Sequence, residues 1–495
     1  MVKAVFGFDV GTSSSKGVLT TLDGRLLGSA QRSHDVSRPR PGHFEMDPDV
    51  WWEEFCSVST ELLSSQPDAE VVAVGVSGMG PCVALVDADH RPVRPAILYG
   101  VDTRSVAEIE EWTDRLGGSD AILTRCGSTL SSQAAGPKMA WVQNNEPDVW
   151  ERATRFFMPA SWLAWNLTGE YVLDHQSASQ CTPMYDIEAR DWYRPWSDQI
   201  APGLELPPLA WADSVAGTVT PAGSSQSGLP AGVPVIVGTI DAWSEALSVD
   251  AHNPGDLMLM YGTTMFFVNT VTDPVRSPLL WGTIGALPDT RNVAGGMATS
   301  GAITNWLRDL FGSPDFSDLV AEADAAGPGA HGLLLLPYFA GERTPVMDPS
   351  ARGVIAGLSV NHSRGDLYRA ALEATGLAVR HNIEAIEAAG GKIDRIVAVG
   401  GGTKGDVWTQ IVSDISGRPQ VIPTETIGAS FGVAWLAART QHDITAAQWN
   451  PPARTLTPRP ENRESYEELY NLYLELYPAT REISHVLAKR QLATS

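Results

Sequence analysis

The stretch FGFDVGTSSSKGVL places an acid, a glycine, several hydroxyl side chains and a lysine between two apolar runs. Small residues at a tight turn let backbone N–H groups converge on phosphate oxygens, while hydroxyls and a lysine add donors and positive charge. A carboxylate beside phosphates is a usual protein ligand of hydrated Mg²⁺. The pattern is compatible with a phosphate turn, with Asp9 as metal ligand and Gly11, Thr12, Ser13 and Lys16 as phosphate contacts.

An ordinary turn with an exposed lysine has a similar composition, because glycine and serine are common turn formers. The stretch also lacks the GK[ST] ending of a Walker A loop. The pattern occurs a second time, where Gly262, Thr263 and Thr264 follow Tyr261 between two apolar runs. Two related halves, each with one Gly-Thr hairpin turn, are what a nucleotide bound in a cleft between them requires.

The stretch GGGTKGDVW admits more than one chemistry. Gly400, Gly402 and Gly405 satisfy GxGxxG between a strand and a helix, and Glu425 lies about twenty residues further on, as in the dinucleotide fingerprint. An NAD-dependent dehydrogenase is therefore one hypothesis. Against it, the motif opens no βαβ unit at the start of a domain and leaves the two Gly-Thr turns unexplained. In a second interpretation, the glycine stretch is a bare backbone surface on which an adenine or ribose lies. In a third, it is only a loop that begins a helix.

Two further stretches, around Asp241 and at GERTP, each have two possible roles. Asp241 follows the apolar run Pro234–Val237 and precedes an expected helix. It is either the helix N-cap, for which Asp is favoured, or a general base that takes a proton from a hydroxyl attacking a phosphoryl group. The polar turn GERTP, Gly341–Pro345, either covers a site or only links two elements.

Bulk properties narrow the class of protein. A chain of 495 residues predicts two or three domains. The net charge of -23 repels nucleic-acid phosphates and anionic membrane surfaces, so neither is an expected partner. The four cysteines form no CxxC pair, which predicts no zinc site or disulfide framework and a cytoplasmic location. Neither a signal peptide nor a bilayer span is expected.

The predicted elements are those of a mixed α/β protein. Strands at 4–8, 18–22 and 26–30 form an antiparallel meander, whose last two strands join at the Asp23-Gly24 turn. Asp47 and Pro48 predict a capped helix start, and apolar spacing predicts a long helix over Asp366–Ala389. The region 121–232 is expected to be irregular. We expect an N-terminal domain at 1–244, a C-terminal domain at 245–440, and a helical extension at 441–495 packed on the second domain.

As an ordered set, these stretches resemble the FGGY carbohydrate kinases, and most closely their xylulokinase-like branch. DVGTSSSK is similar to the first phosphate motif of that family and YGTT to the second. GGGTKGDVWTQIVSDISG is similar to its C-terminal signature, and PYFAGERTPVMDPSARGVIAGLS to the xylulokinase GERTP segment. GHFEMDPDVWW, GVSGMG and GPKMAWVQNNEP match further N-terminal blocks, and the set extends from Phe6 to Ala438.

The resemblance implies a two-domain ribonuclease-H-like fold, shared with actin and hexokinase, in which ATP and a sugar meet in an interdomain cleft. It implies ATP and Mg²⁺ as cofactors, Asp9 as the Mg²⁺ ligand and Asp241 as the catalytic base. The other residues that it implies are Thr12, Lys16, Gly262, Thr263 and Thr264 for phosphate, Gly401, Gly402 and Lys404 for adenosine, and Ser77, Met79, Asp102, Arg104 and Asp241 for the sugar.

Departures from the branch concern the sugar. The branch usually has SGQMHG, whereas Ser77–Pro81 reads SGMGP and lacks the Gln and the His. The WNDGR block reads YGVDTR, with an extra residue, and Ala242 stands where Asn is common. Lost donors change which hydroxyl patterns a site accepts. We predict an ATP-dependent kinase for a hydroxyl of a ketopentose, D-xylulose first, with ribulose, erythritol or gluconate as alternatives.

Two rival classes are a dehydrogenase that uses GGGTKG and a noncatalytic or chaperone-like ATPase of the same fold. The second needs none of the N-terminal sugar blocks, which disfavours it. A homodimer is compatible with the sequence.

Overall fold

The computed structural model describes residues 1–494, and the side chains of residues 1–491. The chain folds into two compact units, neither of which is a single stretch of sequence. Unit 1 consists of Met1–Asn253, Thr272–Asn292 and Ile427–Pro451, and unit 2 of Pro254–Val271, Val293–Thr426 and the residues from Pro452 onward. The domain limits expected at residues 244 and 440 stay predictions.

Unit 1 is built on a mixed sheet with the strand order β13–β14–β5–β1–β2–β3, in which β15 also pairs with β5. The strands are β1 (Val2–Val10), β2 (Ser14–Thr21), β3 (Leu26–Ser33), β5 (Ala69–Gly78), β13 (Val215–Thr218), β14 (Pro234–Ile236) and β15 (Thr239–Ile240). β5 is parallel to β1, β14 and β15, whereas β1, β2 and β3 form the predicted antiparallel meander. The carboxyl ends of β1, β5 and β15 therefore meet at one edge.

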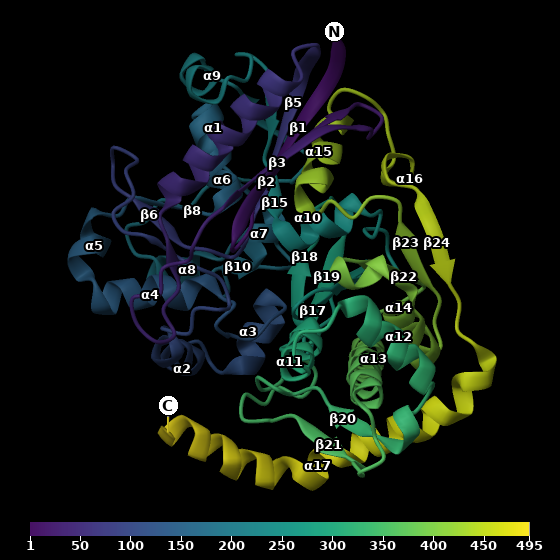
Figure 1. The fold of residues 1–495 in the computed structure, drawn as a ribbon. Helices are drawn as coiled ribbons and strands as arrows, with labels where there is room; N and C mark the ends of the chain where they lie inside the picture. The colour runs from purple at the N-terminus through teal and green to yellow at the C-terminus, as the bar shows by residue number, and fades with distance from the viewer. Residues whose placement is uncertain (495) are drawn as a thin grey trace. The chain divides into compact units, whose positions relative to one another are not determined.

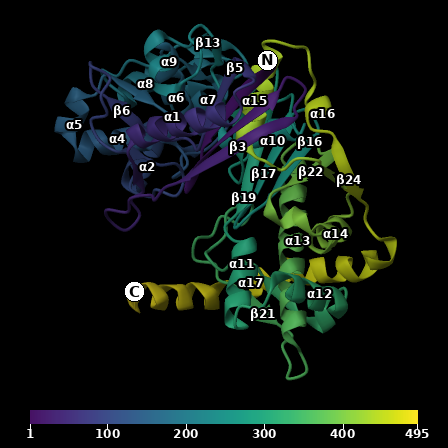
Figure 2. The same ribbon diagram turned by 45° about the horizontal axis from the view of Figure 1, so that its top comes forward.

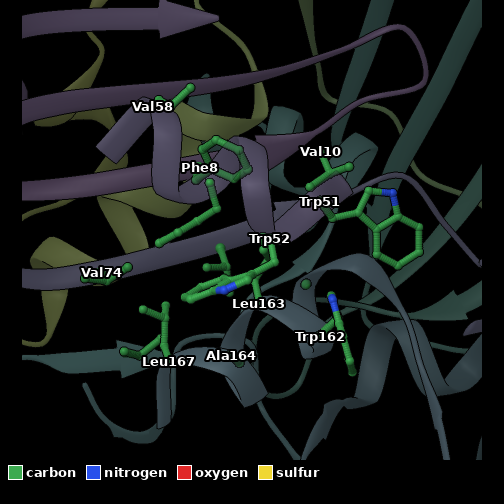
Figure 3. Close-up of a cluster of buried hydrophobic side chains, with 14 of the residues drawn as sticks. Phe8, Val10, Trp51, Trp52, Val58, Val74, Trp162, Leu163, Ala164 and Leu167 are labelled. Atoms are coloured by element: carbon green, nitrogen blue, oxygen red, sulfur yellow. The ribbon is translucent and has the colours of Figure 1, made fainter. Parts of the chain in front are cut away.

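Alternating side chains of β1 pack against helices on opposite faces of this sheet. Phe6 and Phe8 both contact Phe55 of α1 (Pro48–Ser65) edge-on, with ring centroids 5.4 and 5.0 Å apart. Figure 3 shows Phe8 in this core together with Trp52 and Leu163. Gly7 faces α15 (Ala429–Arg439), and a Cβ on it would lie 2.1 Å from the Ser430 carbonyl oxygen. The yellow-green α15 thus lies directly beside the purple β1 (Figure 1).

The expectation of an irregular region at 121–232 was wrong. Unit 1 contains the helices α2 (Val106–Arg115), α3 (Ser119–Cys126), α4 (Ala135–Asn145), α5 (Pro147–Arg152), α6 (Pro159–Thr168), α7 (His175–Ser179), α8 (Arg194–Ile200), α9 (Pro221–Ser227), α10 (Asp241–Ser248) and α16 (Ala446–Trp449). Most residues of α4 and α6 are buried, so these helices show no narrow apolar stripe for a periodicity argument to detect. The predicted start of α1 was right, because Asp47 accepts the Asp49 N–H and Pro48 follows it.

Short pairs of strands complete unit 1. They are β4 (Glu45–Met46), β6 (Ala84–Val86), β7 (Ala96–Ile97), β8 (Arg155–Phe157), β9 (Leu173–Asp174), β10 (Tyr185–Asp186), β11 (Asp191–Trp192) and β12 (Leu209–Ala210). A further strand, β18 (Trp281–Ile284), lies in the segment Thr272–Asn292 and belongs to none of these pairs.

Unit 2 has a second mixed sheet, with the order β19–β17–β16–β22–β23–β24. Its strands are β16 (Asp256–Tyr261), β17 (Met265–Val271), β19 (Arg291–Met297), β22 (Arg395–Val399), β23 (Gln420–Pro423) and β24 (Pro452–Leu456), with the separate pair β20 (Leu334–Leu336) and β21 (Val354–Ala356). Figure 2 shows β17, β16 and β22 side by side. As β1 does in unit 1, β16 lies between an antiparallel hairpin partner and a parallel strand.

The helices of unit 2 are α11 (Gly301–Leu310), α12 (Phe316–Ala326), α13 (Arg364–Ala388), α14 (Asp406–Ser416) and α17 (Arg463–Thr494), with 3₁₀ turns η1 (Ala330–Gly332), η2 (Gly401–Lys404) and η3 (Pro460–Asn462). The predicted long helix is α13, which begins two residues earlier because Ser363 and Asp366 form a capping box. Within residues 1–494, no helix combines the length and the apolar character needed to cross a bilayer.

Candidate active-site residues

The hairpin turn between β1 and β2 is the first candidate phosphate turn. The strand register sets Asp9 opposite Lys16, and the Gly11 N–H donates to the Ser14 carbonyl at 3.0 Å. A Cβ on Gly11 would lie 2.8 Å from that carbonyl oxygen, so the tight turn excludes larger side chains. The Thr12 hydroxyl lies 2.8 Å from the Tyr99 hydroxyl. The turn is therefore a tight hairpin of small residues, as the sequence predicted, and its phosphate contacts stay predictions.

The sheet of unit 1 brings Asp9, Ser77 and Asp241 to one edge. The β5 residue Ser77 is the register partner of both Asp9 on β1 and Thr239 on β15. Its hydroxyl donates to Asp9 Oδ1 at 2.6 Å. Asp241 follows directly after β15, so it lies near the carboxyl ends of the same strands. Such ends are where open α/β sheets commonly place ligands.

Asp241 is the first residue of α10, and Ile240 occupies the N-cap position. The Asp241 carboxylate accepts the Ala242 N–H at 2.7 Å, and α10 has no side-chain cap bond at its N-cap. Capping thus uses one oxygen of Asp241 at most. Burial, with the charges of Asp9 and Glu245 beside it, raises the pKa of Asp241 to about 7. A carboxyl with such a pKa suits proton transfer near neutral pH.

Three carboxyls and one lysine share this corner of unit 1. Burial raises the pKa of Asp9 to about 6, against the lowering effects of the Ser77 hydroxyl and Lys16. Burial and the charge of Asp9 raise the pKa of Glu245 to about 7. Burial also lowers the pKa of Lys16, whose ammonium donates to the Ile427 carbonyl at 2.8 Å. The group has an excess of negative charge that a bound cation would neutralise.

Glu245 was missed in the sequence. Its signal was present, because Glu245 stands four residues after Asp241, and residues spaced by four lie on the same face of a helix. The structure adds that α10 presents this face to β1, since the Glu245 and Asp9 charges interact.

Glu245→Gln is expected to shift the acidic limb of the pH profile of kcat/KM to lower pH, by about half a unit to one unit. The physical reason is that Glu245 raises the pKa of Asp241, so removing its charge lets Asp241 stay deprotonated in more acidic solution. Initial rates between pH 5 and pH 9, with exposed Glu151→Gln as the control, measure the shift. An unchanged limb in Glu245→Gln would contradict this electrostatic coupling.

The residues predicted to contact the sugar lie in unit 1, but the structure pairs two of them with each other. The Arg104 side chain is fully buried, and it donates to Asp102 Oδ2 at 2.8 Å and to Glu45 Oε1 at 2.7 Å. Asp102 also accepts the Phe44 N–H at 2.6 Å. Met79 is buried and donates its N–H to the Val10 carbonyl. The sugar contacts of Asp102 and Arg104 stay predictions.

Two polar residues near these positions were also missed. The Gln133 amide donates to the Gly80 carbonyl at 3.2 Å, and a Cβ on Gly100 would lie 2.1 Å from its side-chain oxygen. Gln133 thus contacts both the SGMG segment and the YGVDTR segment. The fully buried Lys138 donates to the Ser132 carbonyl, and burial lowers its pKa to about 8 against the attraction of Asp102. No spacing pattern linked either residue to the site, because Gln133 contacts Gly80 and Lys138 interacts with Asp102 only through the tertiary fold.

The second candidate phosphate turn, Gly262–Thr264, connects β16 and β17 in unit 2. Its closure repeats the first turn, since the Gly262 N–H donates to the Thr264 carbonyl at 3.1 Å. Backbone N–H groups at the start of α11 hold this turn through hydrogen bonds. The N–H groups of Ser300 and Ala302 donate to the Thr263 carbonyl, and that of Gly301 donates to the Gly262 carbonyl, each at 3.0 Å. The sequence did not indicate this support.

The glycine turn after β22 lies beside the second phosphate turn within unit 2. The parallel register sets Val399 opposite Met260, and a Cβ on Gly400 would lie 2.5 Å from the Tyr261 carbonyl oxygen. A Cβ on Gly402 would meet Trp408 at 2.8 Å, whereas one on Gly401 would meet nothing within 4 Å. The open backbone at Gly401 suits a flat ligand.

Lys404 is exposed at the end of η2. The strands β22 and β23 are parallel and joined through α14, so the GxGxxG stretch does lie in a βαβ unit. Topology alone therefore does not separate a nucleoside triphosphate from a dinucleotide.

Comparison with known proteins decides between a nucleoside triphosphate and a dinucleotide. Residues 4–248 match the N-terminal domain of the FGGY family of carbohydrate kinases, and residues 257–440 match its C-terminal domain. The chain is 30% identical to the xylulose kinase of Staphylococcus epidermidis, over 98% of each chain. It is 32% identical to the glycerol kinase of Nocardia farcinica, over 88% of this chain and 90% of that protein.

The crystal structure of the xylulose kinase from Rhodospirillum rubrum superposes with a TM-score of 0.91 at 30% identity, covering 97% of this chain and 100% of that one. The predicted two-domain α/β fold of the actin and hexokinase type and the predicted class of enzyme, an ATP-dependent phosphotransferase for a sugar hydroxyl, are thereby confirmed. The two matches together cover most of the sequence, and the chain belongs to the FGGY family of carbohydrate kinases.

Proposed function

We propose that this kinase transfers the γ-phosphoryl group of ATP to a hydroxyl of a ketopentose, with D-xylulose as the first candidate. The observation that carries the reaction chemistry is the placement of Asp9 and Asp241 at the carboxyl ends of β1 and β15, with Lys16 opposite Asp9 on β2. The observation that favours D-xylulose is the likeness to proteins named xylulose kinase, over nearly the whole length of both chains.

In the proposed mechanism, Asp241 orients the acceptor hydroxyl and takes its proton as the oxygen attacks the γ-phosphorus. The transferred group carries most of its charge on its non-bridging oxygens, so catalysis depends on positioning and on positive charge. Lys16 and the turn Gly11–Ser13 are the proposed phosphate contacts of unit 1, and Gly262–Thr264 is the proposed phosphate turn of unit 2. Exclusion of water, which domain closure supplies in many kinases, limits ATP hydrolysis.

Asp9 is the proposed protein ligand of Mg²⁺. Ser77 donates to Oδ1, and the Asp9 carboxyl interacts with Asp241 and Glu245, whose pKa values burial raises and charge repulsion raises further, so a cation would relieve that repulsion. Residues 1–494 contain no cluster of three or more metal-ligating side chains. One carboxylate with waters and substrate phosphates is the arrangement that Mg²⁺ commonly accepts, so the donor set fits. When bound, Mg²⁺ would balance charge on the β- and γ-phosphates.

The remaining assignments complete the proposal. Gly401, Gly402 and Lys404 would hold adenosine on the open glycine turn. Ser77, Met79, Asp102 and Arg104 would form or support the wall of the sugar site, with the Gln133 amide as a further donor beside the SGMG segment. A cytoplasmic location and a homodimer stay predictions from the sequence.

A coupled assay of ADP release with Mg²⁺ tests this function. D-xylulose is expected to give the highest kcat/KM among D-xylulose, D-ribulose, erythritol, gluconate and glycerol. Glycerol belongs in the screen because a glycerol kinase is among the relatives and the Gln and His of SGQMHG are missing. A preference of more than tenfold for another acceptor would replace D-xylulose while leaving the kinase class intact.

A further inference from the structure

The GERTP segment, which the sequence left open as either a cover or a linker, lies in a long loop of unit 2. The loop consists of residues 337–353 and connects β20 to β21. Glu342 and Asp348 close it on itself through two backbone hydrogen bonds of 2.8 and 2.9 Å. On its outer side, Asp348 accepts hydrogen bonds from Tyr477 and pairs with His485, each at 2.6 Å, so α17 anchors the loop.

On its inner side the loop binds the end of β19. The buried Glu342 carboxyl accepts two backbone N–H groups at Oε1, from Ala298 at 2.8 Å and from Arg343 at 2.7 Å. The Thr344 hydroxyl accepts the Gly296 N–H at 2.8 Å and donates to Asn382 Oδ1 at 2.6 Å. Two side chains of GERTP therefore fix alternate residues of one short segment, Gly296–Ala298.

That segment continues directly into the support of the second phosphate turn. Ala298 is followed by Thr299, whose hydroxyl donates to the Pro337 carbonyl at the start of the same loop. The next N–H groups, those of Ser300, Gly301 and Ala302, all donate to carbonyls of Gly262 or Thr263. A continuous set of hydrogen bonds thus runs from the loop, through residues 296–302, to the turn at Gly262–Thr264, entirely within unit 2.

We propose that Glu342 and Thr344 are positioning residues that hold the turn Gly262–Thr264 in the conformation that receives ATP phosphate, acting through the backbone of residues 296–302. This inference rests on the proposed function, in which that turn contacts ATP. In this proposal both side chains act through the backbone and make no contact with the nucleotide. Their effect arises because a phosphate turn made of backbone donors binds well only when its geometry is set before the ligand arrives.

The protonation state of Glu342 makes the proposal specific. Burial raises its pKa to about 8, and the N–H groups of Ala298 and Arg343 oppose that rise. The carboxyl is therefore mostly neutral at pH 7, and only Oε1 has protein partners in the described part of the chain. A glutamine keeps an acceptor oxygen and the size of the side chain, so Glu342→Gln is expected to preserve the positioning role. A leucine fills the volume but leaves two buried N–H groups unpaired.

The test compares Glu342→Leu, Glu342→Gln and Thr344→Val in the full-length protein at pH 7. Glu342→Leu is expected to weaken binding of Mg²⁺ and a non-hydrolysable ATP analogue about tenfold by calorimetry, and to raise KM for ATP in parallel. KM for the sugar is expected to change less than twofold. Glu342→Gln is expected to bind the analogue within twofold of the wild type, and Thr344→Val about threefold more weakly. Met347→Ala, an exposed residue of the same loop, is the matched control.

Three results would overturn the proposal. The first is analogue binding by Glu342→Leu that equals the wild type. The second is a loss in Glu342→Gln as large as in Glu342→Leu, which would mean that the charge and not the acceptor matters. The third is an equal rise of KM for ATP and sugar, which is typical of general destabilisation. If Glu342→Leu does not fold, Thr344→Val decides the question. Unchanged binding of the ATP analogue by Thr344→Val would then refute the proposal.

The experiment is independent of the sugar assignment. A wild-type protein that binds the ATP analogue but phosphorylates none of the screened acceptors would contradict the proposed substrate only. The comparison of ATP-analogue binding among the variants would still test the positioning role of Glu342 and Thr344.

Discussion

Asp241→Asn is expected to lower kcat about 10³-fold, within the range of about 10²–10⁴ that a positioned general base supplies. The amide keeps the size and one acceptor oxygen, so the Ala242 N–H stays paired and α10 keeps its start. It cannot accept a proton from the acceptor hydroxyl. Sugar-dependent ADP release under saturating ATP measures the loss, and exposed Asp198→Asn in the same unit is the control. Turnover within threefold of the wild type would remove Asp241 from the role of base.

The same substitution is expected to stabilise the protein in the absence of ligands. The folded pKa of Asp241 is raised above the unfolded value near 4, so the folded state prefers the protonated carboxyl. This preference contributes stability at low pH, which is lost as the pH rises from about 4 to about 7. At pH 8 the ionised, half-buried Asp241 therefore costs stability that asparagine does not.

A rise in Tm of about 2 °C or more at pH 8, absent at pH 4, is the expected result for Asp241→Asn. Thermal unfolding at the two pH values measures it, again beside Asp198→Asn. A variant that loses activity but is less stable than the wild type at pH 8 would show that the loss arises from damaged folding.

Lys16→Ala is expected to lower kcat/KM for ATP about 10²-fold, which is the usual cost of removing one preorganised electrostatic contact. Lys16 is the cation that faces Asp9 in the β1–β2 register and interacts with Glu245. Its removal takes a positive charge from the phosphate turn and leaves the neighbouring carboxyls without compensation. KM for the sugar is expected to stay within about twofold, because sugar binding requires no phosphate charge.

Steady-state kinetics with ATP varied at saturating sugar measure the effect of Lys16→Ala. Lys3→Ala is the matched control, since Lys3 lies on the same strand pair but is exposed at its far end. Unchanged ATP kinetics would return Lys16 to the role of an ordinary strand residue.

Local features of the site could be predicted where neighbouring residues decide the structure. The Asp23-Gly24 hairpin forms as expected, with Gly24 at a φ of 89°, because only a few residues determine such a turn. The start of α1 at Pro48 and the capping box of α13 follow from local hydrogen bonds in the same way. The two Gly-Thr turns also close as hairpins, since each is defined by its own four residues.

Features that depend on distant segments could not be predicted. The helices in the region 121–232 were missed because α4 and α6 are buried on most sides and carry no amphipathic pattern. Glu245 belongs to the site because α10 brings it near Asp9, and Gln133 because it contacts Gly80. Both relations exist only in the folded chain. The role of GERTP remained open because the partners of Glu342 belong to β19, a different part of the chain.

The sequence by itself determined the family, the two glycine hairpins and the residue types of the chemistry, because these depend on short motifs in a given order. Only the tertiary structure decided that Ser77 bonds Asp9, that α15 packs on β1, and that the loop after β20 holds the strand end beneath Gly262–Thr264. Those relations arise from strand register and close packing between segments far apart in the chain. The pKa of Asp241 illustrates the difference, since no local motif contains the burial and the neighbouring carboxylates that raise it.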